Sequence, residues 1–170
     1  ELRDAVLNNG CLLGLATDGD ADRFGVIDSD GTFIQPNQLI PMALPFPAAK
    51  GAHAKEALEV ISRHLLTAHG IRTLGPEESG YRGMYKGPLP ELDASYHQGT
   101  VWPWLLGPYV TALVRLTGDR QEAKRVLKGA KAMLSEYGMG GIAEVYDGDE
   151  PQTPGGCPWQ AWSIAEILRA

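Results

Sequence analysis

The apolar positions in the first part of the chain predict short strands. The run CLLGLA (residues 11–16) has the length of one buried strand and ends at a polar loop. The next stretch, RFGVIDSDGTFIQP (23–36), has an apolar segment, the turn SDG and a second apolar segment, which predicts a β-hairpin. The prolines between residues 36 and 47 oppose a helix there, because proline lacks a backbone N–H. We therefore expect strands and turns over residues 11–35.

From about residue 52 the apolar positions follow helical spacing instead. One face of the first helix would carry Ala54, Ala57, Leu58, Ile61 and Leu65. We expect this helix to end at His69-Gly70, because glycine commonly follows the last turn of a helix. Frequent glycines and prolines predict a loop over residues 71–98. A second helix is predicted over 101–116, with Pro103 in its first turn.

Two more helices are predicted in the last third of the chain. Asp119 is a good N-cap for the third helix, because its short carboxylate side chain can accept hydrogen bonds from the backbone N–H groups of the first helical turn. The apolar stripe of this helix is Ala123, Val126, Leu127, Ala130, Met133 and Leu134. A glycine-rich turn then leads to a last helix in WQAWSIAEILRA (159–170). The pattern predicts a mainly α protein preceded by a short β-hairpin segment.

Composition narrows the class of protein. The chain has 170 residues, 44% of them hydrophobic, and a formal net charge of −6, which favours an ordinary globular fold. We expect no nucleic-acid partner, because no basic patch is visible, and no membrane partner, because no apolar run reaches spanning length. Oligomeric state stays open. Since the first residue is Glu1 rather than Met, we expect a piece of a longer protein.

The two cysteines bear on the compartment. Cys11 and Cys157 have no metal-binding spacing. Free thiols in a cytoplasmic protein are favoured over a disulfide, which remains the alternative.

Three alternating carboxylates form the most acidic loop of the chain. Asp18, Asp20 and Asp22 can converge on one hard cation, and Mg²⁺ suits such oxygen ligands. An EF-hand is not favoured, because Arg23 and Ser29 occupy the positions where that loop needs glycine and glutamate. A solvated acidic turn is the alternative to a metal site.

The string TDGDADRFG, followed by VID, DG, FI and PNQ, resembles the metal loop of the phosphoglucomutase/phosphomannomutase family. The resemblance covers residues 1–38 and implies that the three aspartates hold Mg²⁺ and that Arg23 contacts a phosphate. The phosphoserine loop of that family is absent. The string GPEESGY (75–81) is faintly similar to the family's sugar-binding loop but lacks its histidine.

Two aromatic clusters share the second half of the chain. YHQGTVWPWLLGPY (96–109) and IAEVYDGDEPQTPGGCPWQAWSIAEIL (142–168) contain all four tryptophans. The polar and aromatic groups concerned are His97, Gln98, Trp102, Trp104, Glu144, Trp159, Gln160 and Trp162. Pyranose rings have apolar C–H faces and polar edges, so aromatic faces with amides and carboxylates nearby fit a sugar. Burial of the tryptophans in a core is the alternative.

These two strings, with PNQLIPMALPFP and LLTAHGIRTLGPEESGYRG, resemble the C-terminal end of bacterial glycogen debranching enzymes of the amylo-α-1,6-glucosidase type. The resemblance covers residues 36–170 and implies part of an (α/α)₆ barrel, because four helices cannot close one. It implies hydrolysis by two carboxyl groups, with no cofactor.

The resemblance also assigns roles to residues. Glu144, in IAEVYDG, matches the base, and the sugar contacts would be His97, Gln98, Trp102, Trp104, Gln160 and Trp162. The acid would lie upstream of Asn37, where mutase-like sequence stands instead. Asp93, Asp147 and Asp149 are expected to be surface charges.

The two resemblances divide the chain into residues 1–38 and 39–170, joined at Pro36-Asn37-Gln38. This pattern fits a natural fusion, a fragment or an artefact of assembly. Three functions follow from it: a glycoside hydrolase with an incomplete site for glycogen-like α-1,6-branched glucan, a Mg²⁺-dependent phosphohexomutase fragment, or a non-catalytic carbohydrate-binding remnant.

Overall fold

A computed structural model describes residues 2–11, 13–17, 24–28, 33–34 and 51–170, with side chains placed for residues 3–11 and 51–170. The chain divides into two compact units, Glu1–Ala49 and Lys50–Ala170, which we describe separately.

The first unit has one helix and a three-stranded antiparallel sheet. Helix α1 (Leu2–Asn9) is followed by β1 (Leu13–Thr17), β2 (Phe24–Asp28) and β3 (Phe33–Ile34), in the order β1-β2-β3. Leu13 pairs with Asp28, and Val26 pairs with Ile34. The strands and the β2–β3 hairpin were predicted by the apolar pattern, whereas α1 was not. The aspartate loop between β1 and β2 lies outside the described residues.

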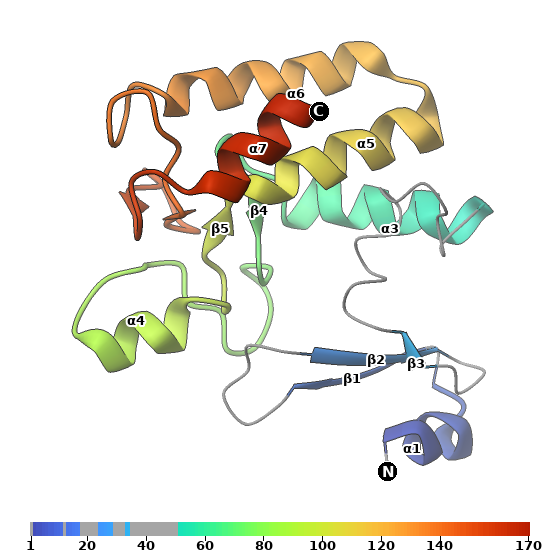
Figure 1. Cartoon of the computed structure of the whole chain (residues 1–170). Coiled ribbons are helices and arrows are strands. Elements are labelled where there is room, and N and C mark those ends of the chain that lie inside the picture. Colours follow the sequence, from blue (N-terminus) through green and yellow to red (C-terminus); the bar gives the residue numbers. More distant parts are fainter. Residues whose placement is uncertain (1, 12, 18–23, 29–32, 35–50) are drawn as a thin grey trace. The chain divides into compact units, whose positions relative to one another are not determined.

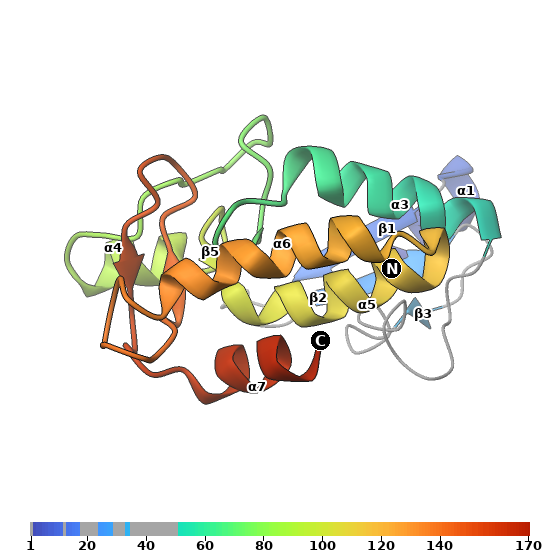
Figure 2. The same cartoon turned by 90° about the horizontal axis from the view of Figure 1, so that it is seen from above.

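The second unit is built around helix α5. Its long helices are α3 (Gly51–His64), α5 (Leu106–Thr117), α6 (Arg120–Met133) and α7 (Ala161–Arg169). Helix α5 packs against the other three. Seen from above, α3 and α7 lie on opposite sides of α5 (Figure 2).

The core of this unit follows the predicted apolar stripes in part, since Ala57 and Leu134 are exposed. Leu106, Val110 and Leu113 of α5 are buried, and so are Ala54 and Leu58 of α3. From α6 the buried side chains are Ala123, Val126, Ala130 and Met133. Burial of these side chains removes apolar surface from water and holds the helices together.

The α5–α6 turn and one close helix contact depend on glycines. Gly118 adopts a left-handed conformation (φ 76°) that ends α5, and Asp119 then caps α6. Gly107 lets α5 approach α7, because a Cβ there would lie 2.8 Å from the backbone oxygen of Glu166.

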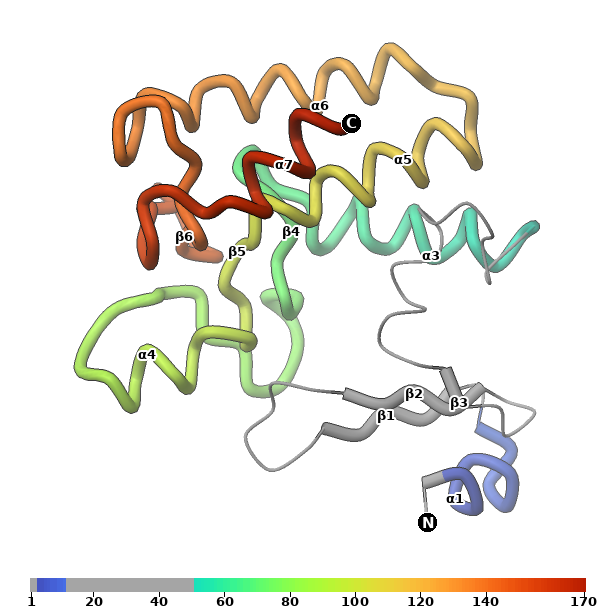
Figure 3. The backbone as a smooth tube through the Cα atoms, viewed as in Figure 1, coloured from blue at the N-terminus to red at the C-terminus, as the bar shows by residue number. Residues whose placement is uncertain are grey.

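A second sheet and a short helix lie at one end of the helices (Figure 1). The strands are β4 (Ile71–Arg72), β5 (Val101–Trp102), β6 (Val145–Tyr146) and β7 (Pro154–Gly155), all antiparallel and in that order. Helix α4 (Leu89–Ser95) leads into β5, and the 3₁₀ turn η2 (Pro103–Leu105) joins β5 to α5. The tube in Figure 3 shows β4, β5 and β6 near the same ends of α3 and α5.

Three predicted boundaries were wrong. Helix α3 ends at His64 rather than His69, because Leu66 turns back to pair with Ile71. The predicted loop over 71–98 contains β4 and α4. The predicted helix over 101–116 begins only at Leu106, because residues 101–102 pair within the sheet and η2 follows.

The mainly helical class is confirmed by these elements, and the partial barrel remains a prediction. Within the described residues, no helix is both long enough and apolar enough to cross a membrane. Cys11 and Cys157 are both free and exposed.

Candidate active site

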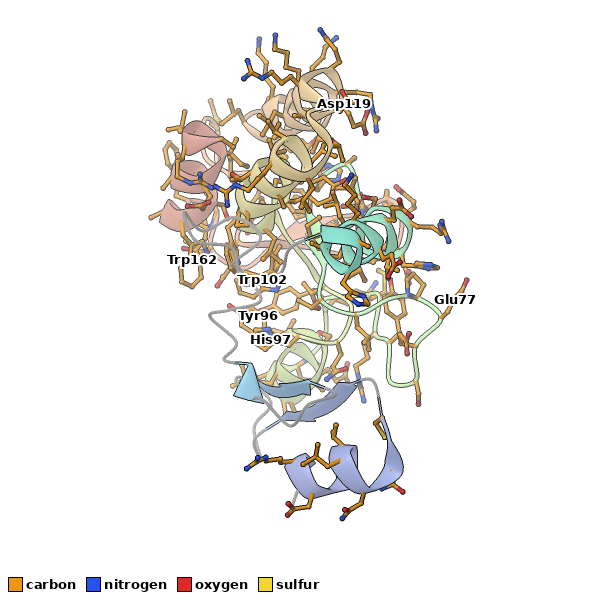
Figure 4. The ribbon with its side chains drawn as sticks, turned by 90° about the vertical axis from the view of Figure 1, so that its right-hand side faces the viewer. Glu77, Tyr96, His97, Trp102, Asp119 and Trp162 are labelled. Carbon is orange, nitrogen blue, oxygen red and sulfur yellow. The ribbon has the colours of Figure 1, made fainter. Side chains whose placement is uncertain are left out.

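The turns at one end of the helices bring the two aromatic clusters of the sequence together. Residues 96–105 lead into α5, residues 142–147 follow α6, and residues 156–160 lead into α7. Backbone pairing joins the last two segments, since the N–H of Glu144 donates to the carbonyl of Cys157 (2.8 Å) and that of Gln160 to Ile142 (2.9 Å). Figure 4 shows Trp162, Trp102, Tyr96 and His97 along one side of this end, away from Glu77 and Asp119.

Glu144 is held at both carboxylate oxygens. The hydroxyl of Tyr96 donates a short hydrogen bond to Oε1, and the backbone N–H of Cys157 donates to Oε2 at 2.9 Å. Gly156 leaves room for this geometry, because a Cβ there would lie 2.5 Å from Oε2. The two donors, one from a side chain and one from the backbone, fix the orientation of this carboxylate beside the ring of Tyr96.

Tyr96 is correspondingly kept protonated. Burial raises the pKa of its phenol above the ordinary value, and the hydrogen bond to Glu144 and the negative charge of that carboxylate raise it further. Tyr96 therefore serves as the hydrogen-bond donor of the pair.

Aromatic rings surround this pair. His97 is stacked on Trp102, with ring centroids 5.7 Å apart and an interplanar angle of 6°. Tyr96 meets Trp102 edge to face at 4.9 Å, and its carbonyl accepts from the indole N–H of Trp102 (3.1 Å). Trp162 lies 6.2 Å from Trp102 and 6.4 Å from Trp104. The aromatic cluster thus consists of Tyr96, His97, Trp102, Trp104 and Trp162.

The members of this cluster differ in exposure. Trp102 is 5% exposed and Trp162 is 53% exposed. Trp102 is therefore a core residue that supports His97, as the alternative interpretation expected for tryptophan. Trp162 offers accessible aromatic surface of the kind that stacks on a sugar.

The two amides predicted to bind sugar stand close in sequence to His97 and Trp162. Gln98 follows α4, and Gln160 occupies the N-cap position of α7 without a side-chain capping bond. Both side chains are half-buried.

Asp147 was wrongly expected to be a surface charge. It is 4% exposed, and its Oδ1 accepts from the backbone N–H of Tyr85 at 2.6 Å. Asp93 and Asp149 are exposed as expected.

Asp147 positions Tyr85 beside the aromatic cluster. The ring of Tyr85 lies 5.6 Å from that of Tyr96. Burial raises the pKa of the Tyr85 phenol, and the negative charges of Glu144 and Asp93 add to the shift.

Sequence reasoning missed Tyr85, Tyr96 and Cys157 as site residues. Tyr96 is adjacent to the predicted His97, so the string YHQ could have indicated it. The roles of Tyr85 and Cys157 depend on contacts between distant segments, which local spacing does not report.

The proposed ligands of Mg²⁺, Asp18, Asp20 and Asp22, and the proposed phosphate contact Arg23 lie outside the described residues. In the part of the chain that the structure describes, no group of three or more acidic, histidine or cysteine side chains could hold a metal ion.

Residues 19–169 match the family described as amylo-alpha-1,6-glucosidase. The chain belongs to this family. The match confirms the resemblance inferred from the two aromatic strings, and it begins at residue 19, further toward the N-terminus than the expected residue 36.

Curated relatives of this amylo-alpha-1,6-glucosidase family member are much longer than the chain. A glycogen debranching enzyme of Saccharomyces cerevisiae is 27% identical over 158 residues, which is 79% of this chain and 10% of that protein. Phosphoglucosamine mutases of Cupriavidus metallidurans and Cupriavidus pinatubonensis are 33% and 31% identical over 44% and 45% of the chain, and each match covers 17% of the mutase.

Proposed function

We propose that this chain supplies the base and part of the sugar-binding surface for hydrolysis of α-1,6 branches in a glycogen-like glucan. One observation carries the proposal. Glu144 has both carboxylate oxygens occupied by donors and stands beside the aromatic cluster. Family membership and the similarity to a glycogen debranching enzyme support the choice of substrate.

Glu144 would act as the general base. An inverting glycosidase reverses the configuration at the anomeric carbon. One of its carboxylates removes a proton from a water molecule, and that water attacks the anomeric carbon. A second carboxyl group protonates the leaving oxygen from the opposite side of the bond, about 6.5–9.5 Å away. Donation by Tyr96 and by the backbone of Cys157 would orient Glu144 for the first role.

Sugar contacts would come from the aromatic cluster and its polar neighbours. Trp162 would stack on a pyranose face, and Trp104 would extend that surface. His97, Gln98 and Gln160 would hydrogen-bond to hydroxyl groups, while Trp102 would hold His97 in place through their stacking.

The proposal includes low activity for this chain alone. The sequence offers no partner carboxyl for Glu144 in the expected place, and loss of a general acid–base group costs about 10²–10⁴ in rate. We therefore expect binding of glucan with slow release of glucose from a branched limit dextrin.

Two measurements test this function. Malto-oligosaccharide at millimolar concentration should change tryptophan fluorescence, and Glu144→Gln should reduce any glucose release by a further factor of about 10²–10⁴. Glu77→Gln is the matched control, because Glu77 is exposed and lies away from the cluster (Figure 4). An unchanged fluorescence spectrum contradicts sugar binding. If Glu144→Gln releases as much glucose as the native chain, Glu144 is not the base. If the chain binds malto-oligosaccharide but releases no glucose, a carbohydrate-binding remnant is supported.

A second candidate function rests on the two phosphoglucosamine mutase matches. In that function Asp18, Asp20 and Asp22 would hold Mg²⁺, and Arg23 would contact the phosphate of a sugar phosphate.

A further inference from the structure

Trp159 stands apart from the aromatic cluster. The structure describes no ring contact between it and any of the cluster's members, and its indole N–H makes no hydrogen bond within the described residues. Its side chain is nevertheless 55% exposed. This large aromatic side chain is therefore accessible to solvent and to a ligand.

One side of the Trp159 ring lies against a turn of glycines. A Cβ on Gly138 would lie 3.0 Å from Nε1 of the indole, and one on Gly141 would lie 2.8 Å from Cδ2. A Cβ on Gly140 would lie 3.8 Å from Cη2 of the same ring, an ordinary van der Waals distance. A side chain at Gly141 would press on the indole, so the absence of one there lets the turn and the ring come close together.

The backbone on either side of Trp159 is fixed by the site itself. Two residues earlier, Cys157 accepts from the N–H of Glu144 and donates to its Oε2. One residue later, Gln160 donates to the carbonyl of Ile142. The segment that carries the indole is thus paired with the segment that carries the candidate base.

We propose that Trp159 is a separate sugar-stacking platform, which binds a glucose unit of an α-glucan beyond the units held at Glu144. This inference rests on the proposed function, because that function supplies the glucan. A half-exposed indole can stack on the apolar C–H face of a pyranose, and its N–H, which makes no hydrogen bond within the described residues, can donate to a hydroxyl group.

The test follows each tryptophan separately. The full chain is labelled with 5-fluorotryptophan, and its four ¹⁹F resonances are assigned with single Trp→Phe variants. Maltoheptaose is then titrated in. We expect the Trp159 resonance to shift saturably, and Trp159→Ala to weaken maltoheptaose binding about five- to tenfold, as loss of one stacking contact implies. Leu168→Ala is the matched control, since Leu168 is 81% exposed at the far end of α7, and it should leave binding unchanged.

Each other outcome has a distinct meaning. If the Trp162 resonance shifts while that of Trp159 does not, the platform is overturned and the proposed function stands. If only Trp159 responds, the platform stands and sugar binding at the aromatic cluster fails. If no resonance responds to maltoheptaose, both are overturned. A Trp159 resonance that changes with protein concentration instead of sugar identifies a protein contact and overturns the platform.

Discussion

At the scale of single residues, the candidate site depends on one hydrogen bond. The Tyr96 hydroxyl donates to Glu144, and this hydrogen bond contributes to the raised pKa of the phenol. The same phenol is the centre of the ring contacts to His97 and Trp102. A change at Glu144 should therefore be measurable at Tyr96.

We expect Glu144→Gln to lower the pKa of Tyr96 toward its ordinary value. In the native protein, burial raises this pKa first, and the hydrogen bond and charge of Glu144 raise it further. The substitution removes only the contribution of the negative charge, so the pKa of Tyr96 should fall but stay above the ordinary value for tyrosine. Alkaline titration of tyrosinate absorbance measures the change.

A second pair of variants distinguishes the titration of Tyr96 from that of Tyr85. Glu144 also raises the pKa of Tyr85, though burial contributes more there. In a Tyr96→Phe background, Glu144→Gln should therefore produce only the smaller shift, in the pKa of Tyr85. If the titration curve shifts equally in both backgrounds, Tyr96 is not the partner of Glu144.

The residue scale also shows what the sequence can and cannot predict of the site. Glu144 and His97 were predicted as site residues from short strings, and both contact Tyr96 in the structure, while their roles stay predictions. Asp147 was misassigned to the surface, since its burial depends on the backbone of Tyr85, 62 positions earlier. The sequence carries no local signal of that contact.

At the scale of elements, capping and apolar periodicity were reliable guides. Helix α6 begins after Asp119 as predicted, and its apolar stripe is buried at four positions. Helix α4 was missed because Pro88 and Pro90 were interpreted as loop residues. Proline is also common in the first turn of a helix, and Pro90 stands there in α4. The choice between the two depends on packing, which the pattern does not contain.

We expect Asp119→Ala to reduce the free energy of unfolding by about 1 kcal/mol. The carboxylate accepts from the backbone N–H groups of Gln121 (3.0 Å) and Glu122 (2.9 Å), which have no partner inside the first turn. Urea denaturation measures the loss. Asp119→Asn is the control, because its amide oxygen can accept the same bonds and should preserve most of the stability. Equal losses in the two variants would show that the charge matters more than the cap.

At the scale of the whole molecule, the chain combines two kinds of similarity. Its family match covers residues 19–169, so it includes Asp20 and Asp22 as well as Glu144. The chain spans a tenth of the yeast relative and about a sixth of each mutase. The two candidate functions need different residues of the chain: the hydrolase needs Glu144, and the mutase needs the aspartate loop.

The aspartate loop gives the clearest distinction between these functions. If it acts as in the mutases, Mg²⁺ should bind weakly, because three carboxylates without a phosphoserine leave ligand positions that water must fill. Titration calorimetry with Mg²⁺ should then give heat that Asp20→Asn removes. Asp28→Asn is the matched control, since it deletes the same charge from β2 outside the triplet and should retain the heat. Equal heats for the native chain and Asp20→Asn would exclude the metal site and leave the acidic turn as the better account. Loss of heat in both variants would instead indicate a general effect of charge.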